Sequence, residues 1–389
     1  MNRPALTRRT MTYTSTASSS VPTVQPTENR LKLGVFAING GAAFTNHPDR
    51  FVPTWENNLR IAQQADRLGI EKLVSASRWK PFHKDGHYSG DLFETFTWAA
   101  AVAAVTEHIE VVSTVHLATV HPIIAAKSAA TVDLISGGRF GMNLVCGWYR
   151  AEMEMFGTAM PGHDDRYSLA DEWVEIFNRL WSDPRSFDYD GTFYQLKGAI
   201  AQPHAPFPRP TLLNAGGSER GRAFAAKNCD IAFVVPQDPR PEAIRRQVEE
   251  YRRQARDIHG KEIEVWMSCY VVQRDTREQA DAYVQDYVVN QGDAEGVDSF
   301  MANNVGNAET WPPEVVQHVR FAVAAGYGGY PLVGSAEDIA EKLSALSDAG
   351  VDGFLMSWLD YEGGLTAFSQ SVLPQLEQAG LRAPGRQQF

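Results

Sequence analysis

Short apolar runs alternate with amphipathic stretches along the chain from Leu31 onward, a pattern typical of repeated strand–helix–strand units. Eight runs predict strands: Leu31–Ile38, Lys72–Ser77, Glu110–His116, Phe140–Cys146, Thr211–Ala215, Asp230–Val235, Glu262–Val272 and Gly353–Leu359. Eight strands that alternate with helices favour a closed (β/α)₈ TIM barrel, an α/β fold, over a doubly wound sheet.

Helical periodicity fills the intervals between these runs. The predicted helices are Trp55–Leu68, Leu92–Thr106, Ile123–Ile135, Ser168–Trp181, Glu219–Lys227, Pro241–His259, Glu337–Ala349 and a last one over about Thr366–Gln378. The first strand leads into FAINGG rather than G-x-G-x-x-G, so a dinucleotide-binding sheet loses its main sequence support.

Two connections are longer than ordinary strand-to-helix loops. One runs from Trp148 to Tyr167 after the fourth strand, and the other from about Ala282 to Leu332 after the seventh. Long connections within a compact domain usually serve as lids, binding loops or oligomer contacts. Because the loops that follow barrel strands form the active face, both insertions are expected there.

Residues 1–30 are rich in Thr, Ser and Pro, and no hydrophobic segment follows Arg8 and Arg9, so they do not form a secretory signal. We predict a disordered N-terminal tail over residues 1–30 and one barrel domain over residues 31–389. No apolar run approaches the roughly 18–20 residues that a membrane span needs.

Charge and cysteine usage narrow the class of partner. The formal net charge of −11 argues against a nucleic-acid or anionic-membrane surface and suits small-molecule ligands. The three cysteines, Cys146, Cys229 and Cys269, are far apart and show no C-x-x-C spacing, which predicts a reducing cytoplasm and no disulfide framework or zinc site. The histidines show no H-E-x-x-H pattern, so no metal site is predicted.

Asn143 is a polar amide inside an apolar strand. A buried amide needs partners for both its carbonyl and its NH₂ group. Those partners are either neighbouring backbone groups or a bound molecule with alternating donors and acceptors, such as the edge of a flavin ring.

The turn Gly216-Gly217-Ser218 joins the fifth strand to a helix. Small residues allow close approach of the backbone, and the free N–H groups at a helix start bind anions such as phosphate. A tight turn without a ligand is the alternative. Arg166 and Tyr167, expected just before a helix, can complete a phosphate pocket; a solvated arginine beside a packed tyrosine is the alternative there.

Ser77 and Arg78 end the predicted second strand at the barrel mouth, where Arg78 either holds an anionic group or makes a surface salt bridge. Thr114 and His116 lie in the third strand. Histidine can act as a general base near neutral pH.

Five segments follow one another along the chain: SGGRFGMNLVCGW, Glu152, DDRYSLADEW, FDYDGTFYQLKG and PRPTLLNAGGSERGRAFAA. In this order and spacing they resemble the bacterial luciferase-like flavin monooxygenases, over nearly the whole chain after the tail. The resemblance is strongest to the branch that contains pyrimidine and sulfone monooxygenases.

The resemblance implies roles for individual residues. Ser77 and Arg78 would lie beside the flavin, Asn143 would meet its ring, and Glu152 matches a carboxylate of the site; Arg166, Tyr167, Gly216, Gly217 and Ser218 would surround the FMN phosphate. Val74, Thr114 and Asn143 would form the pocket where oxygen meets the flavin. Val74 stands in place of a leucine and His116 in place of a small residue, and both departures face the substrate side.

The implied activity is that of a two-component monooxygenase. It would take reduced FMN (FMNH₂) from a separate flavin reductase and use O₂, through a flavin peroxide, to open an N-heterocycle or to cleave a C–N or C–S bond of a small-molecule substrate. The family resemblance also implies a homodimer or homotetramer. A deazaflavin-dependent oxidoreductase and a non-catalytic flavin-binding subunit are the alternatives, and the presence of both Thr114 and Asn143 argues against the second.

Overall fold

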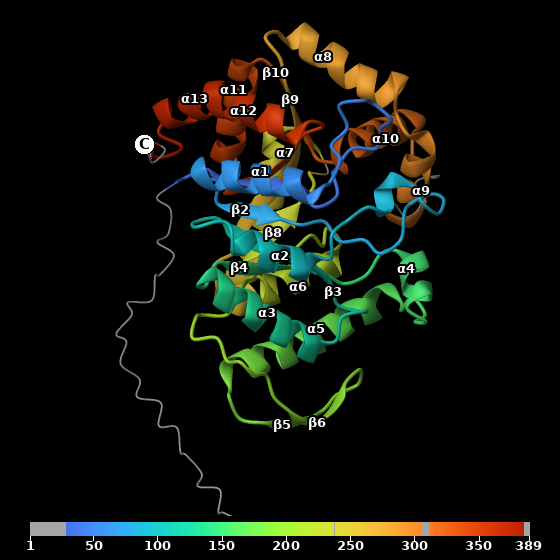
Figure 1. The fold of residues 1–389 in the computed structure, drawn as a ribbon, viewed down its shortest axis with the longest axis vertical. Coiled ribbons are helices and arrows are strands. Elements are labelled where there is room, and N and C mark those ends of the chain that lie inside the picture. The colour runs from blue at the N-terminus through green and yellow to red at the C-terminus, as the bar shows by residue number, and fades with distance from the viewer. Residues whose placement is uncertain (1–28, 237, 305–310, 385–389) are drawn as a thin grey trace, which may run out of the picture.

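A computed structural model of the chain describes residues 29–236, 238–304 and 311–384. Its parallel barrel strands are β1 (Lys32–Phe36), β2 (Lys72–Val74), β3 (Glu110–His116), β4 (Phe140–Val145), β7 (Thr211–Asn214), β8 (Ile231–Val234), β9 (Glu264–Gln273) and β11 (Gly353–Ser357). They pair in that order, and β11 pairs with β1, so that the barrel closes (Figure 1). The predicted TIM barrel is confirmed.

Helices surround the barrel. They are α1 (Trp55–Arg67), α2 (Thr95–Ala103), α3 (Pro122–Ser136), α5 (His163–Ser182), α6 (Glu219–Asn228), α7 (Pro241–His259), α11 (Ala336–Asp348), α12 (Tyr361–Ser371) and α13 (Leu373–Gln378), with a short 3₁₀ turn at Tyr88–Gly90. The sequence predicted one last helix over about Thr366–Gln378, and this prediction is wrong, because α12 and α13 are separate helices. Pro374 cannot continue a helix, because it lacks the N–H and its ring clashes with the preceding turn, so a second helix starts there.

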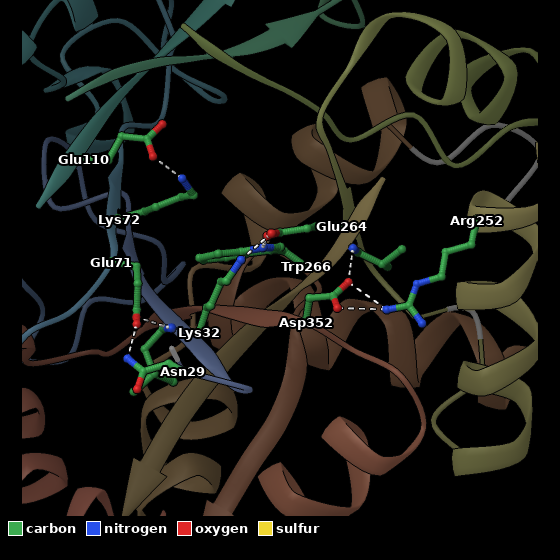
Figure 2. A network of polar contacts seen from close by, with 11 residues as sticks. Asn29, Lys32, Glu71, Lys72, Glu110, Arg252, Glu264, Trp266 and Asp352 are labelled. Carbon is green, nitrogen blue, oxygen red and sulfur yellow. Dashed lines mark hydrogen bonds and ion pairs between the residues drawn. The ribbon is translucent and has the colours of Figure 1, made fainter. Parts of the chain in front are cut away.

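The barrel interior is polar at the amino ends of the strands and apolar above. Lys32 pairs with Glu264, and Lys72 pairs with Glu110, as Figure 2 shows. The next layer consists of Val74, Val112, Leu213, Ile231, Phe233, Trp266 and Leu355. This end of a TIM barrel serves stability, whereas chemistry belongs to the opposite end.

Further ion pairs join neighbouring segments of the chain at the amino ends of the barrel strands. Arg382 pairs with Glu71 at 2.9 Å, and both side chains are buried. Asp352 accepts from Arg252 at 2.8 Å and from the backbone N–H of Val265 at 2.7 Å (Figure 2). The C-terminal segment is thereby fixed to the base of the barrel.

Both long insertions contain regular structure. The first holds α4 (Arg150–Met155). The second begins within α8 (Arg277–Gln285), holds a π-helical turn at Asp286–Asn290, α9 (Ala294–Asn304) and α10 (Pro313–Gly326), and ends within β10 (Tyr330–Gly334). Figure 1 shows α4, α9 and α10 gathered at one side of the barrel, on the right of the view. Strand β10 extends the sheet along the far part of β9, at Cys269–Gln273. It was not predicted, because a short run containing Pro331 is a weak strand signal.

A hairpin between α5 and β7 was also not predicted. It consists of β5 (Phe187–Asp190) and β6 (Gln195–Ala199), and it lies at the lower edge of the molecule in Figure 1. The Glu172 carboxylate accepts from the backbone N–H groups of Thr192 at 2.8 Å and Phe193 at 3.0 Å. Two of the sequence segments that carry the resemblance, DDRYSLADEW and FDYDGTFYQLKG, thus meet in this hairpin.

Candidate active site

Strand alternation directs Thr114 and Asn143 into the barrel, just above its apolar layer. The register pairs Thr114 with Asn143 and Val112 with Val74. Because successive side chains point to opposite faces, the neighbours Val115 and Leu144 face the surrounding helices instead. Val74, Thr114 and Asn143 are all buried.

Asn143 is half satisfied. Its Nδ2 donates to Thr114 Oγ1 at 3.1 Å, and the Thr114 hydroxyl in turn donates to the carbonyl oxygen of Ser75. Its Oδ1 is buried and accepts no hydrogen bond in the part of the chain that the structure describes. Such an atom costs about 1–3 kcal/mol. The alternative in which Asn143 satisfies itself on backbone groups is therefore not what the structure shows, and its carbonyl fits an N–H donor such as that of a flavin ring.

A second buried pair lies farther along β3. His116 Nδ1 is 3.1 Å from Glu152 Oε2, and Glu152 comes from α4 in the first insertion. Glu152 Oε1 accepts from the backbone N–H of Trp79 at 2.6 Å and of Lys80 at 3.3 Å. His116 Nε2 is buried and has no partner among the described residues. The resemblance did not indicate that these two residues would form a pair.

The turn before α6 forms an open backbone cradle. Ser218 is the N-cap, and its hydroxyl accepts from Gly221 N at 3.0 Å. A methyl group on Gly216 would lie 2.7 Å from Asn214 Oδ1 and 2.9 Å from Tyr167 Oη, whereas one on Gly217 would meet nothing within 4 Å. The backbone is thus tightly held at Gly216 and open at Gly217, as a phosphate site at a helix N-terminus requires.

Arg166 and Tyr167 lie in the first turns of α5 rather than before it, because α5 begins at His163, five residues earlier than the predicted start at Ser168. Asp164 and Asp165 favour this earlier start, because acidic side chains stabilise a helix N-terminus. Arg166 Nη1 donates to the carbonyl of Gly147, and its buried Nε has no partner in the described residues. The half-buried Arg166 is therefore not a solvated surface arginine.

The Tyr167 phenol reaches the same turn. Its ring packs against Phe224 at 5.8 Å between ring centroids, and burial raises the pKa of the phenol. The structure thus places Tyr167 beside Gly216 of this turn, while Arg166 is bound to Gly147 after β4. That the two residues complete a phosphate pocket stays a prediction.

Ser77 and Arg78 follow β2 rather than end it, since the strand stops at Val74. Ser77 is half-buried. Arg78 is buried; its Nε donates to the carbonyl of Ser89, its Nη1 donates to Tyr327 Oη at 2.8 Å, and its guanidinium lies 4.2 Å above the Phe82 ring. Among residues 29–236, 238–304 and 311–384, Arg78 makes no surface salt bridge of the kind considered from the sequence. Arg78 instead joins the loop after β2 to the end of α10.

Sequence reasoning missed several residues near the site. Asn214 ends β7; its Nδ2 donates to Leu144 O at 2.6 Å and its Oδ1 accepts from Gly216 N at 2.9 Å, which fixes the cradle to β4. An amide at the end of an apolar run was the available signal. Tyr327 carries no such signal, because only the packing of the insertion brings it to Arg78.

An aromatic cluster joins the loops after β1, β2 and β4 to the second insertion. It comprises Phe44, Phe82, Trp148, Tyr149, Phe300 and Tyr327, whose neighbouring ring centroids lie 5.3–5.8 Å apart. Offset and edge-to-face aromatic contacts of this kind stabilise packing beyond simple area burial.

Two further observations concern residues 29–236, 238–304 and 311–384. No three His, Cys, Asp or Glu side chains in these ranges are grouped so that they could hold a metal ion. No helix there combines the length and the apolar character that a membrane crossing requires.

Comparison with known proteins bears on the family. The family model described as luciferase-like monooxygenase matches residues 31–353. The pyrimidine monooxygenase RutA of Escherichia coli O8 (strain IAI1) is 28% identical over 360 residues, which cover 89% of this chain and 92% of that protein.

Solved structures agree in fold. A riboflavin lyase (RcaE) superposes with a TM-score of 0.80 at 24% identity, and the long-chain alkane monooxygenase LadA with a TM-score of 0.79 at 21% identity. Each superposition covers 92% of this chain and 94% of the other. The resemblance stated from the sequence, and with it the enzyme class of flavin-dependent monooxygenase, is confirmed. The chain belongs to the luciferase-like monooxygenase family.

Proposed function

We propose that this monooxygenase, which uses reduced FMN and O₂, oxygenates a small organic substrate at the carboxyl ends of its barrel strands, with Asn143 and Thr114 beside the flavin ring. The observation that carries the proposal is Asn143 Oδ1, which is buried above the apolar layer of the barrel and has no partner in the part of the chain that the structure describes. Bound reduced flavin supplies the activation of O₂, and the protein supplies position and a dry site.

The cradle at residues 216–218 and Arg166 would hold the FMN phosphate. Open backbone at Gly217 admits the anion, the start of α6 presents N–H groups, and the Arg166 side chain adds positive charge with an unused Nε. Asn214 supports this assignment, since it ties the cradle to β4, the strand that carries Asn143. Asn214 would thereby keep the proposed phosphate and ring sites at a fixed separation.

At the ring, Asn143 Oδ1 would accept a flavin N–H. The Thr114 hydroxyl donates to Ser75 O, so it presents lone pairs to the site and acts as the acceptor for Asn143. Val74 would border the oxygen pocket on the β2 side. Replacing the family leucine by this smaller valine leaves that pocket larger.

The aromatic cluster would exclude water from the reaction. Phe300 of α9 and Tyr327 at the end of α10 come from the second insertion and pack on Phe44 from the loop after β1. We assign this insertion the role of a lid, because active-site closure prevents loss of reactive intermediates to water.

We also propose a substrate class, a partner enzyme, an oligomeric state and a disordered tail. The name of the pyrimidine monooxygenase relative supports an N-heterocyclic substrate. The proposed reaction is opening of that ring, or cleavage of a C–N or C–S bond. FMNH₂ would come from a separate reductase, and the enzyme would act in the cytoplasm as a homodimer or homotetramer. The single domain would follow a disordered tail; apart from residues 29 and 30, that tail lies outside the described residues.

The test is an oxygen-uptake assay with photoreduced FMN and a panel of N-heterocycles and sulfones. We expect oxygen uptake and an oxygenated product with at least one member of the panel. Reduced deazaflavin in place of FMN should support neither. Turnover with deazaflavin and no oxygen uptake would establish the oxidoreductase alternative, and bound flavin without any product would favour the non-catalytic subunit.

A further inference from the structure

The His116–Glu152 pair leaves one buried nitrogen, His116 Nε2, without a partner among the described residues. His116 lies two residues beyond Thr114 on the same face of β3, so it sits about 7 Å farther toward the open end. Its register partner on β4 is Val145, two residues beyond Asn143. The imidazole is thus one layer outward from the proposed flavin contact, on the side from which a substrate enters.

The contacts of Glu152 fix which nitrogen of His116 carries hydrogen. A carboxylate only accepts, so His116 Nδ1 donates to Glu152 Oε2 at 3.1 Å. The bond at one ring nitrogen sets the tautomer of a neutral imidazole. Nε2 is then a bare acceptor, and it is this buried atom that has no partner in the described part of the chain.

Glu152 itself has no freedom to turn away. Its Oε1 accepts from two consecutive backbone N–H groups, those of Trp79 and Lys80, and the residue is only 2% exposed. Those two donors hold one oxygen in place and leave the other for His116. The carboxylate therefore acts as the positioning residue of a fixed histidine.

We propose that His116 Nε2, oriented by Glu152, is a specificity-determining acceptor that selects substrates carrying an N–H group. The substrate class is a neutral heterocyclic lactam or imide, because the carboxylate of Glu152 directly behind the imidazole disfavours an anion. The proposal rests on the proposed function, since it places the substrate between the flavin ring and the lid.

One substitution, Glu152→Gln, should turn His116 Nε2 from an acceptor into a donor while it keeps a side chain of almost the same size. In Glu152→Gln, the N–H groups of Trp79 and Lys80 still require an oxygen, so the new NH₂ group must face His116 Nδ1. His116 would then accept at Nδ1 and carry its hydrogen on Nε2. If the His116–Glu152 pair had only a structural role, Glu152→Gln would not change the preference for ligands that carry an N–H group.

The experiment uses ¹⁵N-histidine NMR on the full chain, with His116→Gln serving only to identify the signals. The probes are matched pairs with and without N–H: uracil and 1,3-dimethyluracil, 2-pyridone and N-methyl-2-pyridone, and succinimide and N-methylsuccinimide. His121→Gln is the control, because His121 lies just after β3, outside the proposed site, and caps α3 by accepting from Ile123 N.

In the wild type we expect an unprotonated Nε2. The N–H member of at least one pair should bind about tenfold tighter than its methylated partner, which corresponds to one hydrogen bond of roughly 1.4 kcal/mol. In Glu152→Gln, Nε2 should be protonated and the preference should fall to within about twofold, whereas His121→Gln should keep it. A protonated Nε2 in the wild type, equal binding within every pair, or no binding of any probe would overturn the proposal. The oxygen-uptake assay is independent of these signals, so a failure of the proposed function would be seen separately.

Discussion

Asn143 and Thr114 face each other across β4 and β3, and the bond from Asn143 Nδ2 to Thr114 Oγ1 leaves the Asn143 carbonyl without a donor among the described residues. A polar group left in this state within a packed barrel is costly unless a ligand completes it. The pair is therefore where we propose that the protein meets the bound flavin.

Replacement of Asn143 should separate activity from stability. Asn143→Ala removes the proposed flavin contact, and we expect oxygenation to fall by about 10²–10³-fold, as for loss of one preorganised polar contact. The melting temperature should change little, because the substitution also removes an unsatisfied buried oxygen. Product formation with reduced FMN and thermal unfolding are the two measurements.

The matched control for Asn143 is Ser113→Ala. Ser113 neighbours Thr114, but its hydroxyl donates to Thr95 O on the helical side of β3. Its turnover should stay at the wild-type level. Equal turnover in Asn143→Ala and the wild type would refute the assigned role of Asn143.

The cradle before α6 offers a paired test at adjacent glycines. A methyl group at Gly216 would clash with Asn214 Oδ1 and with the Cα atom of Gly221, both at 2.7 Å, whereas one at Gly217 meets open space. Gly216→Ala should weaken FMN binding by about tenfold or more, and Gly217→Ala by no more than about twofold. Flavin fluorescence titration measures both, with circular dichroism to check folding.

Ser218→Ala tests the cap of the same helix. Loss of the N-cap bond to Gly221 N should weaken FMN binding by about two- to fivefold, because a cap contributes on the order of 0.5–1 kcal/mol while the backbone N–H groups remain. The same fluorescence titration applies. A complete loss of binding in a folded Ser218→Ala protein would show that the hydroxyl itself holds the phosphate.

Asp133 should make stability depend on pH. Burial raises the pKa of this carboxyl to about 7, and its Oδ2 has no partner in the described residues. In the unfolded chain the value is about 3.9, so between about pH 4 and pH 7 the native state holds the extra proton. Stability from this group is therefore present at low pH and lost as the pH rises through about 7.

Asp133→Asn should remove this dependence. We expect the variant to be more stable than the wild type by about 1–3 kcal/mol at pH 8 and equal to it near pH 4, from urea unfolding at each pH. An unchanged difference between the two proteins across this range would contradict the assignment.

Arg139 in the segment SGGRFG should matter for folding rather than chemistry. It is buried, and its guanidinium donates to the carbonyls of Ser136, Ile109, Ala103 and Thr106. Arg139→Met leaves these acceptors unsatisfied, and we expect a loss of about 3 kcal/mol or more in urea unfolding. Arg185→Met, at an arginine whose side chain is 85% exposed, should change stability by less than about 0.5 kcal/mol.

The alternation of apolar runs was sufficient for the barrel and for most of its helices. Each of the predicted strands appears within a few residues of its expected position, and α7 has the predicted ends. Strand β10 and the hairpin β5–β6 were missed, since short, partly polar runs with proline or glycine depend on partners distant in sequence for their pairing.

Some features of the candidate site could likewise be predicted from the sequence, and others could not. The sequence by itself determined the turn Gly216–Ser218, its N-cap, and Asn143 as a polar group in a buried strand, because these features depend on local geometry and strand alternation. Only the tertiary structure decided that Glu152 binds His116 and that Arg78 binds Tyr327, since those contacts join residues from separate loops and insertions. Hydrophobic periodicity encodes which face of an element is buried, but it carries no information on which two loops meet above the barrel.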